Sequence, residues 1–115
     1  MTPTLFSPSA STSVFRIDKF AVSPDSLSAF MGRVQRIRRL LETQPGCKQN
    51  LVLTQTGGPG EFNVVTVVEW ASAQAMSEAK AAIDAHYAGE GFDPQAFMQS
   101  LGVRADLALY TTTHG

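Results

Sequence analysis

The hydrophobic pattern of the chain begins with a strand that is followed by a helix. Residues 14–22 are rich in β-branched and aromatic side chains, which predicts a strand. Ser23 and Pro24 then provide an N-cap and a first helical residue. A stripe of hydrophobic side chains at spacings of three and four predicts an amphipathic helix that ends at Pro45 and Gly46. The stripe consists of Leu27, Phe30, Met31, Val34, Ile37 and Leu41.

A pair of strands follows this helix. Residues 49–56 and 61–70 are both rich in β-forming side chains, and residues 57–60 between them read Gly-Gly-Pro-Gly. Such a break between two strands is typical of a hairpin turn. A phosphate-binding loop would require a helix directly after the glycines, whereas a strand follows here, so a plain turn is favoured.

The C-terminal third predicts two more helices and a last strand. Ser72 is a good cap for a helix over residues 73–88, whose hydrophobic stripe includes Ile83, and Gly89 and Gly91 follow it. Asp93 and Pro94 start a short third helix, and residues 103–112 form the last strand. The predicted order is therefore β-α-β-β-α-α-β.

This order predicts an α+β fold of the ferredoxin-like, split β-α-β type, with a four-stranded antiparallel sheet. Right-handed crossovers place both long helices on one face of the sheet. In the strand over residues 61–70, even-numbered residues face one side, and Val65 and Val67 face the other. Because the middle of this strand is hydrophobic on both faces, the uncovered face is expected to meet a second copy of the chain. The prediction is a homodimer in which two sheets pack face to face.

Length and composition narrow the possible classes of protein. The 115 residues suffice for one domain, assigned to residues 14–115, and residues 1–13 carry no charged side chain and are predicted to form a disordered leader. A net charge of −1 argues against nucleic acid as a partner, and no hydrophobic run is long enough to span a membrane. With one cysteine and two histidines, a metal site is not expected. The absence of a signal-peptide pattern favours a cytoplasmic location.

Two pairs of opposite charges lie on strands that are neighbours in this fold. Arg16 and Asp18 are two residues apart on the first strand, and Arg104 and Asp106 are two apart on the last. One shared register would place Arg16 opposite Asp106 and Asp18 opposite Arg104. These residues form either a cross-strand ladder of ion pairs or a polar wall that orients a substrate.

The clearest resemblance of this chain to a known family lies in the segment that joins the third strand to the second helix. Residues 67–75 read VVEWASAQA, and Pro45, Gly46 and Cys47 follow the first helix. In their order and spacing, these motifs resemble the antibiotic biosynthesis monooxygenase family over about residues 14–110. The resemblance implies a dimeric α+β barrel. It also implies oxidation of electron-rich phenols or quinols by molecular oxygen without a metal, flavin or other cofactor.

The resemblance also suggests some of the site residues. Trp70 matches the tryptophan that ends the family's strand, and Thr66 stands where well-known oxygenases have an asparagine. In the haem-degrading branch, the position of the axial histidine corresponds to Lys80 here, so no haem ligand is carried over.

Further candidates come from the helices. His86 lies on the flank of the second helix's hydrophobic stripe, where it is either a general base or a helix-end side chain in solvent. Tyr87 is either a core residue or a hydrogen-bonding partner of a substrate. Arg38 lies beside the first helix's stripe and either extends from the core edge or reaches an anionic ligand. Other basic residues of that helix are expected in solvent, and they are Arg33, Arg36 and Arg39.

These observations predict a cofactor-independent monooxygenase that acts on a small aromatic, quinol or polyketide-like compound. A non-catalytic module that binds or senses such a ligand is the alternative, and a haem-binding relative ranks third. The predicted catalytic residues are Thr66, Trp70 and His86, and the hypothesis requires that they share one cavity. The predicted substrate-binding residues are Arg16, Asp18, Arg38, Met76, Tyr87, Phe97 and Met98.

Overall fold

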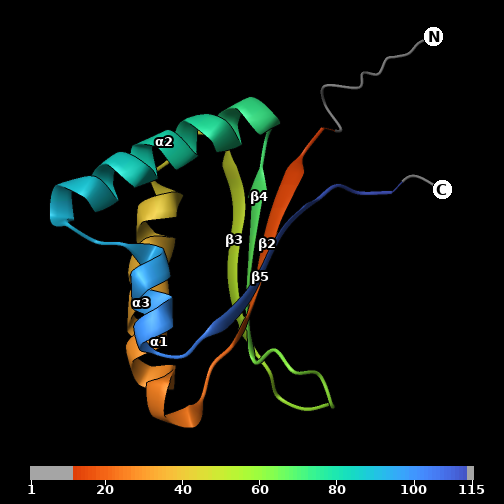
Figure 1. The fold of residues 1–115 in the computed structure, drawn as a ribbon. Helices are drawn as coiled ribbons and strands as arrows, with labels where there is room; N and C mark the ends of the chain where they lie inside the picture. Colours follow the sequence, from red (N-terminus) through yellow and green to blue (C-terminus); the bar gives the residue numbers. More distant parts are fainter. Residues whose placement is uncertain (1–11, 114–115) are drawn as a thin grey trace, which may run out of the picture.

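A computed structural model describes residues 12–113, and all seven predicted elements are present in it (Figure 1). Most of the predicted leader, residues 1–13, lies outside the described residues. The elements are β2 (Val14–Ala21), α1 (Pro24–Glu42), β3 (Cys47–Thr54), β4 (Val64–Trp70), α2 (Ala73–Glu90), α3 (Pro94–Ser100) and β5 (Arg104–Tyr110).

The four strands form one antiparallel sheet in the order β3-β4-β2-β5. The first and last strands of the chain are therefore neighbours, as the ferredoxin-like topology requires. Figure 1 shows the helices on one side of the sheet, and within residues 12–113 no helix lies on its other face, which is called the uncovered face below. The predicted α+β fold is confirmed.

The helices begin where the sequence provides caps. Ser72 accepts a hydrogen bond from the backbone N–H of Ala75 at 3.0 Å, and Asp93 caps α3 in the same manner. Ser23 occupies the N-cap of α1 without a side-chain bond, and its backbone carbonyl accepts from Ser26 instead. Pro24 at the first helical turn helps to start this helix.

Gly46 allows the turn after α1 to approach the start of α2 closely. Its φ is +87°, and a Cβ atom at this position would lie 2.6 Å from the Cβ of Ala75. No other residue type fits both the left-handed backbone and this contact without a shift of the neighbouring helix. The Pro-Gly turn thereby brings α2 against the end of the sheet.

The core consists of two clusters of buried side chains between the helices and the sheet. One contains Phe20, Phe30 and Val64 with their neighbours, and it packs α1 and α3 on the sheet. The other contains Val68, Trp70 and Ala79, and it packs α2 on β4. Members of both clusters face a cavity that is described below.

The register of β5 differs from the prediction. Arg16 lies opposite Leu109 and Asp18 lies opposite Leu107, so the predicted pairs of Arg16 with Asp106 and of Asp18 with Arg104 are wrong. The register is shifted by three residues from the predicted one, and an odd shift turns every side chain of β5 to the other face. The cause lies just before the strand, where Val103 packs against the first core cluster. Alternation from this buried residue directs Arg104 and Asp106 away from the helices.

The uncovered face of the sheet carries a hydrophobic row that crosses all four strands. Leu51 lies beside Val67, Val67 beside Ile17, and Ile17 beside Ala108. On the neighbouring positions of the edge strands, Leu53 and Tyr110 are also exposed. The strand β4 is thus hydrophobic on both faces, as the sequence predicted.

Candidate functional site

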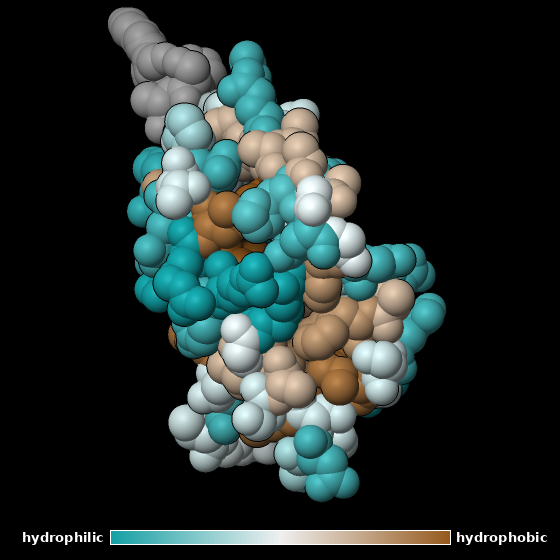
Figure 2. Space-filling view, turned by 90° about the vertical axis from the view of Figure 1, so that its left-hand side faces the viewer, coloured by the Kyte–Doolittle hydropathy of each residue, from teal (hydrophilic) through white to brown (hydrophobic). Residues whose placement is uncertain are grey.

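A cavity of about 350 Å³ lies between the sheet and the helices. Its walls are mainly hydrophobic and come from all three helices and all four strands. Figure 2 views the helical side, where hydrophilic side chains cover the middle of the surface and hydrophobic surface shows in gaps above and below them. A cavity of this size and character suits a small hydrophobic or aromatic ligand.

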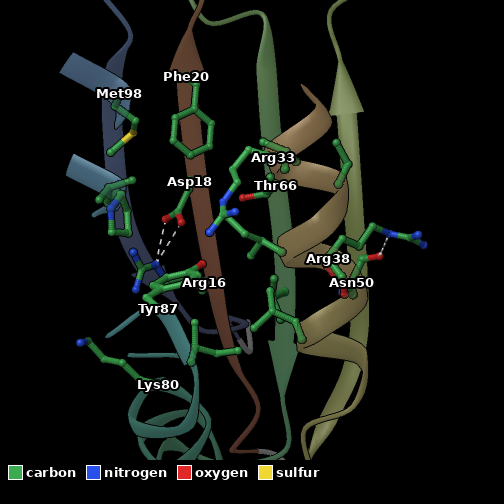
Figure 3. A pocket seen from close by; sticks show the side chains of 18 of the residues that line it. Arg16, Asp18, Phe20, Arg33, Arg38, Asn50, Thr66, Lys80, Tyr87 and Met98 are labelled. Atoms are coloured by element: carbon green, nitrogen blue, oxygen red, sulfur yellow. Dashed lines mark hydrogen bonds and ion pairs between the residues drawn. The ribbon is translucent and has the colours of Figure 1, made fainter. Parts of the chain in front are cut away.

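The part of the wall formed by the sheet carries an ion pair. Arg16 donates from Nε to both carboxylate oxygens of Asp18, at 2.9 and 3.2 Å. The Asp18 side chain is 15% exposed, and its neighbour on β4 is Thr66, which also lines the cavity. Figure 3 shows Asp18, Arg16 and Thr66 directed into the same space. The structure thus places polar groups at the centre of a mainly hydrophobic chamber.

The pKa of Asp18 is raised above its ordinary value, chiefly because the carboxylate is buried. The hydrogen bond and positive charge of Arg16 oppose this effect, and the charge of Asp106 adds to it. The folded chain therefore holds this proton to a higher pH than the unfolded chain does. The contribution of Asp18 to stability falls as the pH rises through the window between the two pKa values, and it stays unfavourable at neutral pH.

Replacing Asp18 with asparagine is therefore expected to raise the melting temperature at pH 7, because a neutral amide removes the cost of the buried charge. Near pH 3 the gain should be much smaller, since the aspartate is then largely protonated in both states. Thermal unfolding at both pH values measures the difference. As a control, Asp25→Asn makes the same change at an exposed position in the first turn of α1 and should lower the melting temperature slightly. A melting temperature that falls at pH 7 for Asp18→Asn contradicts the prediction.

Arg38 lines the cavity and is also anchored to the neighbouring strand. Its Nε donates to the backbone carbonyl of Asn50 at 3.3 Å, and the Asn50 side-chain amide donates to the carbonyl of Arg38 at 2.9 Å. The guanidinium also lies 3.5 Å from Glu42. Of the two predicted roles, these contacts favour a structural one that ties α1 to β3. Asn50 lines the cavity as well and was not predicted.

Arg33 lies in the cavity wall, so its predicted place in solvent is wrong. Its guanidinium carbon is 3.3 Å from the centre of the Phe92 ring, and one terminal nitrogen donates to Glu90. Glu90 also accepts from Arg36 at 2.7 Å, and the two arginines lower the pKa of Glu90. A helical wheel of α1 alone could not reveal this arrangement, because the residues that cover Arg33 lie at the end of α2 and directly after it.

Aromatic side chains from α2, α3 and the turn between them form another part of the wall. The ring of Tyr87 contacts Phe92 at 5.2 Å between centroids, and Phe92 contacts Phe97 at 5.5 Å. Burial raises the pKa of the Tyr87 hydroxyl. Three of the predicted binding residues also line the cavity, and they are Met76, Phe97 and Met98.

The three predicted catalytic residues do not share one cavity. Thr66 and Trp70 line it, whereas His86 is exposed on α2 and is not among the lining residues. His86 directly precedes Tyr87, and successive residues of a helix point about 100° apart, so an inward tyrosine leaves the histidine outside. The catalytic roles of Thr66 and Trp70 stay predictions, and the geometry gives no support to His86 as a base within the cavity.

Within residues 12–113, no three histidine, cysteine, aspartate or glutamate side chains gather closely enough to hold a metal ion. In the same part of the chain, no helix is both long and hydrophobic enough to cross a membrane.

The fold and the cavity define a small α+β protein with a mainly hydrophobic chamber between its helices and its sheet. The sequence model of the antibiotic biosynthesis monooxygenase family matches residues 13–92, and the chain belongs to this family. No curated protein matches the chain in sequence.

Solved structures with the same fold come from several organisms. SnoaB, a cofactor-independent oxygenase from Streptomyces nogalater, is 19% identical, with a TM-score of 0.58 over 90% of this chain and 96% of that one. A conserved protein from Methanosarcina mazei Go1 is 15% identical, with a TM-score of 0.70 over 91% and 97%. Rv0793 from Mycobacterium tuberculosis is 14% identical, with a TM-score of 0.63 over 90% and 98%. At such identities the similarity establishes the fold and leaves the reaction open.

Proposed function

We propose that this protein is a cofactor-independent monooxygenase that oxidises a small aromatic, quinol or polyketide-like compound inside the cavity. The observation that carries the proposal is a mainly hydrophobic chamber of about 350 Å³, with a few polar groups at its centre, in a member of this family. SnoaB, which shares the fold, is a cofactor-independent oxygenase. The size lies within the range of about 300–1,000 Å³ that is typical of small-molecule sites.

The proposed reaction needs no electron donor other than the substrate. For a methylene group between two aromatic rings, as in an anthrone, two hydrogens are lost and one oxygen atom is gained as a carbonyl. The second oxygen atom of O2 leaves as water, so the substrate supplies all four electrons. The protein contributes by excluding water and by favouring the anionic form of the substrate, which is the form that reduces oxygen.

Oxygen consumption tests the proposal. Purified protein is supplied with a panel of anthrones and quinols in the presence of a metal chelator, and oxygen uptake is followed together with product formation. Met76→Trp enlarges a side chain in the cavity wall and should abolish uptake. Gln74→Trp introduces the same ring at an exposed position of α2 and should leave uptake unchanged.

A non-catalytic binding module is the other outcome of this experiment. Compounds that raise the melting temperature without any oxygen uptake would contradict the monooxygenase and favour the binding module. The same hydrophobic wall accounts for both, so turnover itself is the measurement that separates them.

The proposed state of assembly is a homodimer. Its support is the hydrophobic row of Leu51, Val67, Ile17 and Ala108 on the uncovered face, where none of the described helices lies. Two such faces packed against each other would remove this row from water while each cavity stays within its own subunit.

A further inference from the structure

Asp18 is the group in the cavity that is best placed to accept a proton. It lies on β2, in the interior of the sheet, and its side chain is 15% exposed among mainly hydrophobic walls. Arg16 holds the carboxylate with two hydrogen bonds from one nitrogen, and both side chains face the cavity (Figure 3). A carboxylate fixed in this manner presents its oxygen atoms to a bound molecule in a defined direction.

We propose that Asp18 and Arg16 form a proton-abstracting pair, in which Asp18 removes the acidic proton of the substrate and Arg16 balances the negative charge that results. The inference rests on the proposed function, because it assigns the step that turns the substrate into its oxygen-reactive anion. It also narrows the substrate class to aromatic ketones and phenols that form a stabilised enolate or phenolate.

The other titratable groups of the cavity fit the role less well. Lys80 and Asp84 pair with each other at 2.7 Å, and both side chains are more than half exposed. Tyr87 has a raised pKa, so it stays protonated and does not act as a base at neutral pH. His86 lies outside the cavity. Asp18 is largely buried and is held by Arg16, and an aspartate in a mainly hydrophobic site can serve as the base for a proton near a carbonyl group.

Charge balance explains the presence of Arg16. Before the reaction the carboxylate and the guanidinium form a neutral pair. When the proton moves from carbon or oxygen of the substrate to an oxygen of Asp18, the bonding electron pair stays on the substrate, which becomes an anion. Asp18 is then neutral, and the charge of Arg16 is left to stabilise the new anion beside it. The bonds to Asp18 use Nε of Arg16, so its terminal nitrogens can turn to the substrate.

The experiment measures proton removal in the absence of oxygen. Anthrone is incubated with the wild-type protein in deuterated buffer under anaerobic conditions, and proton NMR follows the loss of its methylene signal beyond the rate in buffer alone. We expect the protein to accelerate this exchange and Asp18→Asn to reduce the acceleration by about 10²- to 10⁴-fold. Asp18→Glu should restore part of it. With the matched control Asp25→Asn, the anthrone should exchange at the rate seen with the wild-type protein.

Arg16→Gln tests the second member of the pair. Asp18 is faced by Arg16 on its own strand, and Asp106 on β5 also acts on its charge. The other charged or titratable groups of the cavity come from α1 and α2, and they are Arg33, Arg38, Lys80, Asp84 and Tyr87. Because Arg16 lowers the pKa of Asp18, its loss should move the acidic limb of the exchange profile to higher pH, whereas Arg16→Lys should shift it less. A purely structural role would leave the limb in place.

The outcomes of this experiment and of the oxygen assay are independent. Oxygen uptake without protein-dependent exchange, or exchange that survives Asp18→Asn within twofold in a folded variant, overturns the proton-abstracting pair and leaves the monooxygenase standing. Exchange that depends on Asp18, without oxygen uptake by any compound, supports the pair and contradicts the monooxygenase. Thermal unfolding of each variant shows whether it is folded.

Discussion

Replacing Leu51 and Leu53 together with lysine is expected to convert the proposed homodimer into a monomer. The two side chains are 38% and 47% exposed on the uncovered face of β3, and Leu51 begins the hydrophobic row that crosses the sheet. Two added positive charges per subunit would have to be buried without partners if two sheets packed face to face. Because both positions are exposed in the single chain, each subunit should stay folded.

Light scattering coupled to size-exclusion chromatography measures this change. At micromolar concentration the wild-type protein should have twice the chain mass of 12.4 kDa, and the double variant should have the mass of a single chain. Leu109→Lys is the matched control, because Leu109 is 55% exposed on the cavity side of β5 and should leave the dimer intact. A wild-type chain that is already monomeric at this concentration contradicts the proposed assembly.

The order of elements could be predicted from the sequence because it follows from local patterns, and the placement of both long helices on one face then follows from the handedness of the crossovers. The stripe on α1 and the cap at Ser72 each depend on residues within a few positions of one another. The two-faced character of β4 is also local, since alternation along one strand fixes which side chains share a face.

Features that depend on contacts between distant segments could not be predicted in this manner. The register of β5 depends on Val103, which packs into a cluster formed by β2, α1 and β4. The position of Arg33 depends on its contacts with Phe92 and Glu90, which lie more than 50 residues further along the chain. The position of His86 required the rotation of α2 about its axis, and a stripe with few large side chains leaves that rotation poorly determined.

The residues of the cavity wall could be predicted partly from local alternation, and partly only from contacts between distant segments. Thr66 and Trp70 could be assigned to one side of β4 by alternation, and Arg16 and Asp18 to one side of β2. The two sets lie side by side because Asp18 pairs with Thr66 across the strands. The topology implies this pairing, but the local pattern does not. The polar centre of the chamber is therefore a product of the fold.

Replacing Trp70 with alanine is expected to lower the free energy of unfolding by about 3–5 kcal/mol. The side chain is only 3% exposed, and it joins Val68 and Ala79 in the cluster that fixes α2 on the sheet. A loss of this size is a large part of the stability of a small domain. Urea unfolding measures it, and a loss below about 1 kcal/mol would contradict the structural role, since a buried tryptophan cannot be removed so cheaply.

Trp70→Phe separates the contribution of Trp70 to the core from its contact with the substrate. Phenylalanine keeps an aromatic ring in the cluster, so the loss of unfolding free energy should be clearly smaller than with alanine. If Trp70 only forms the wall, the rate of oxygen uptake should change little. It should stay within about tenfold of the wild-type rate, which is about 1.4 kcal/mol in activation free energy. We expect this result, because Asp18 and Arg16 carry the proton step. A well-folded Trp70→Phe protein that had lost uptake altogether would instead give the indole a direct part in the reaction.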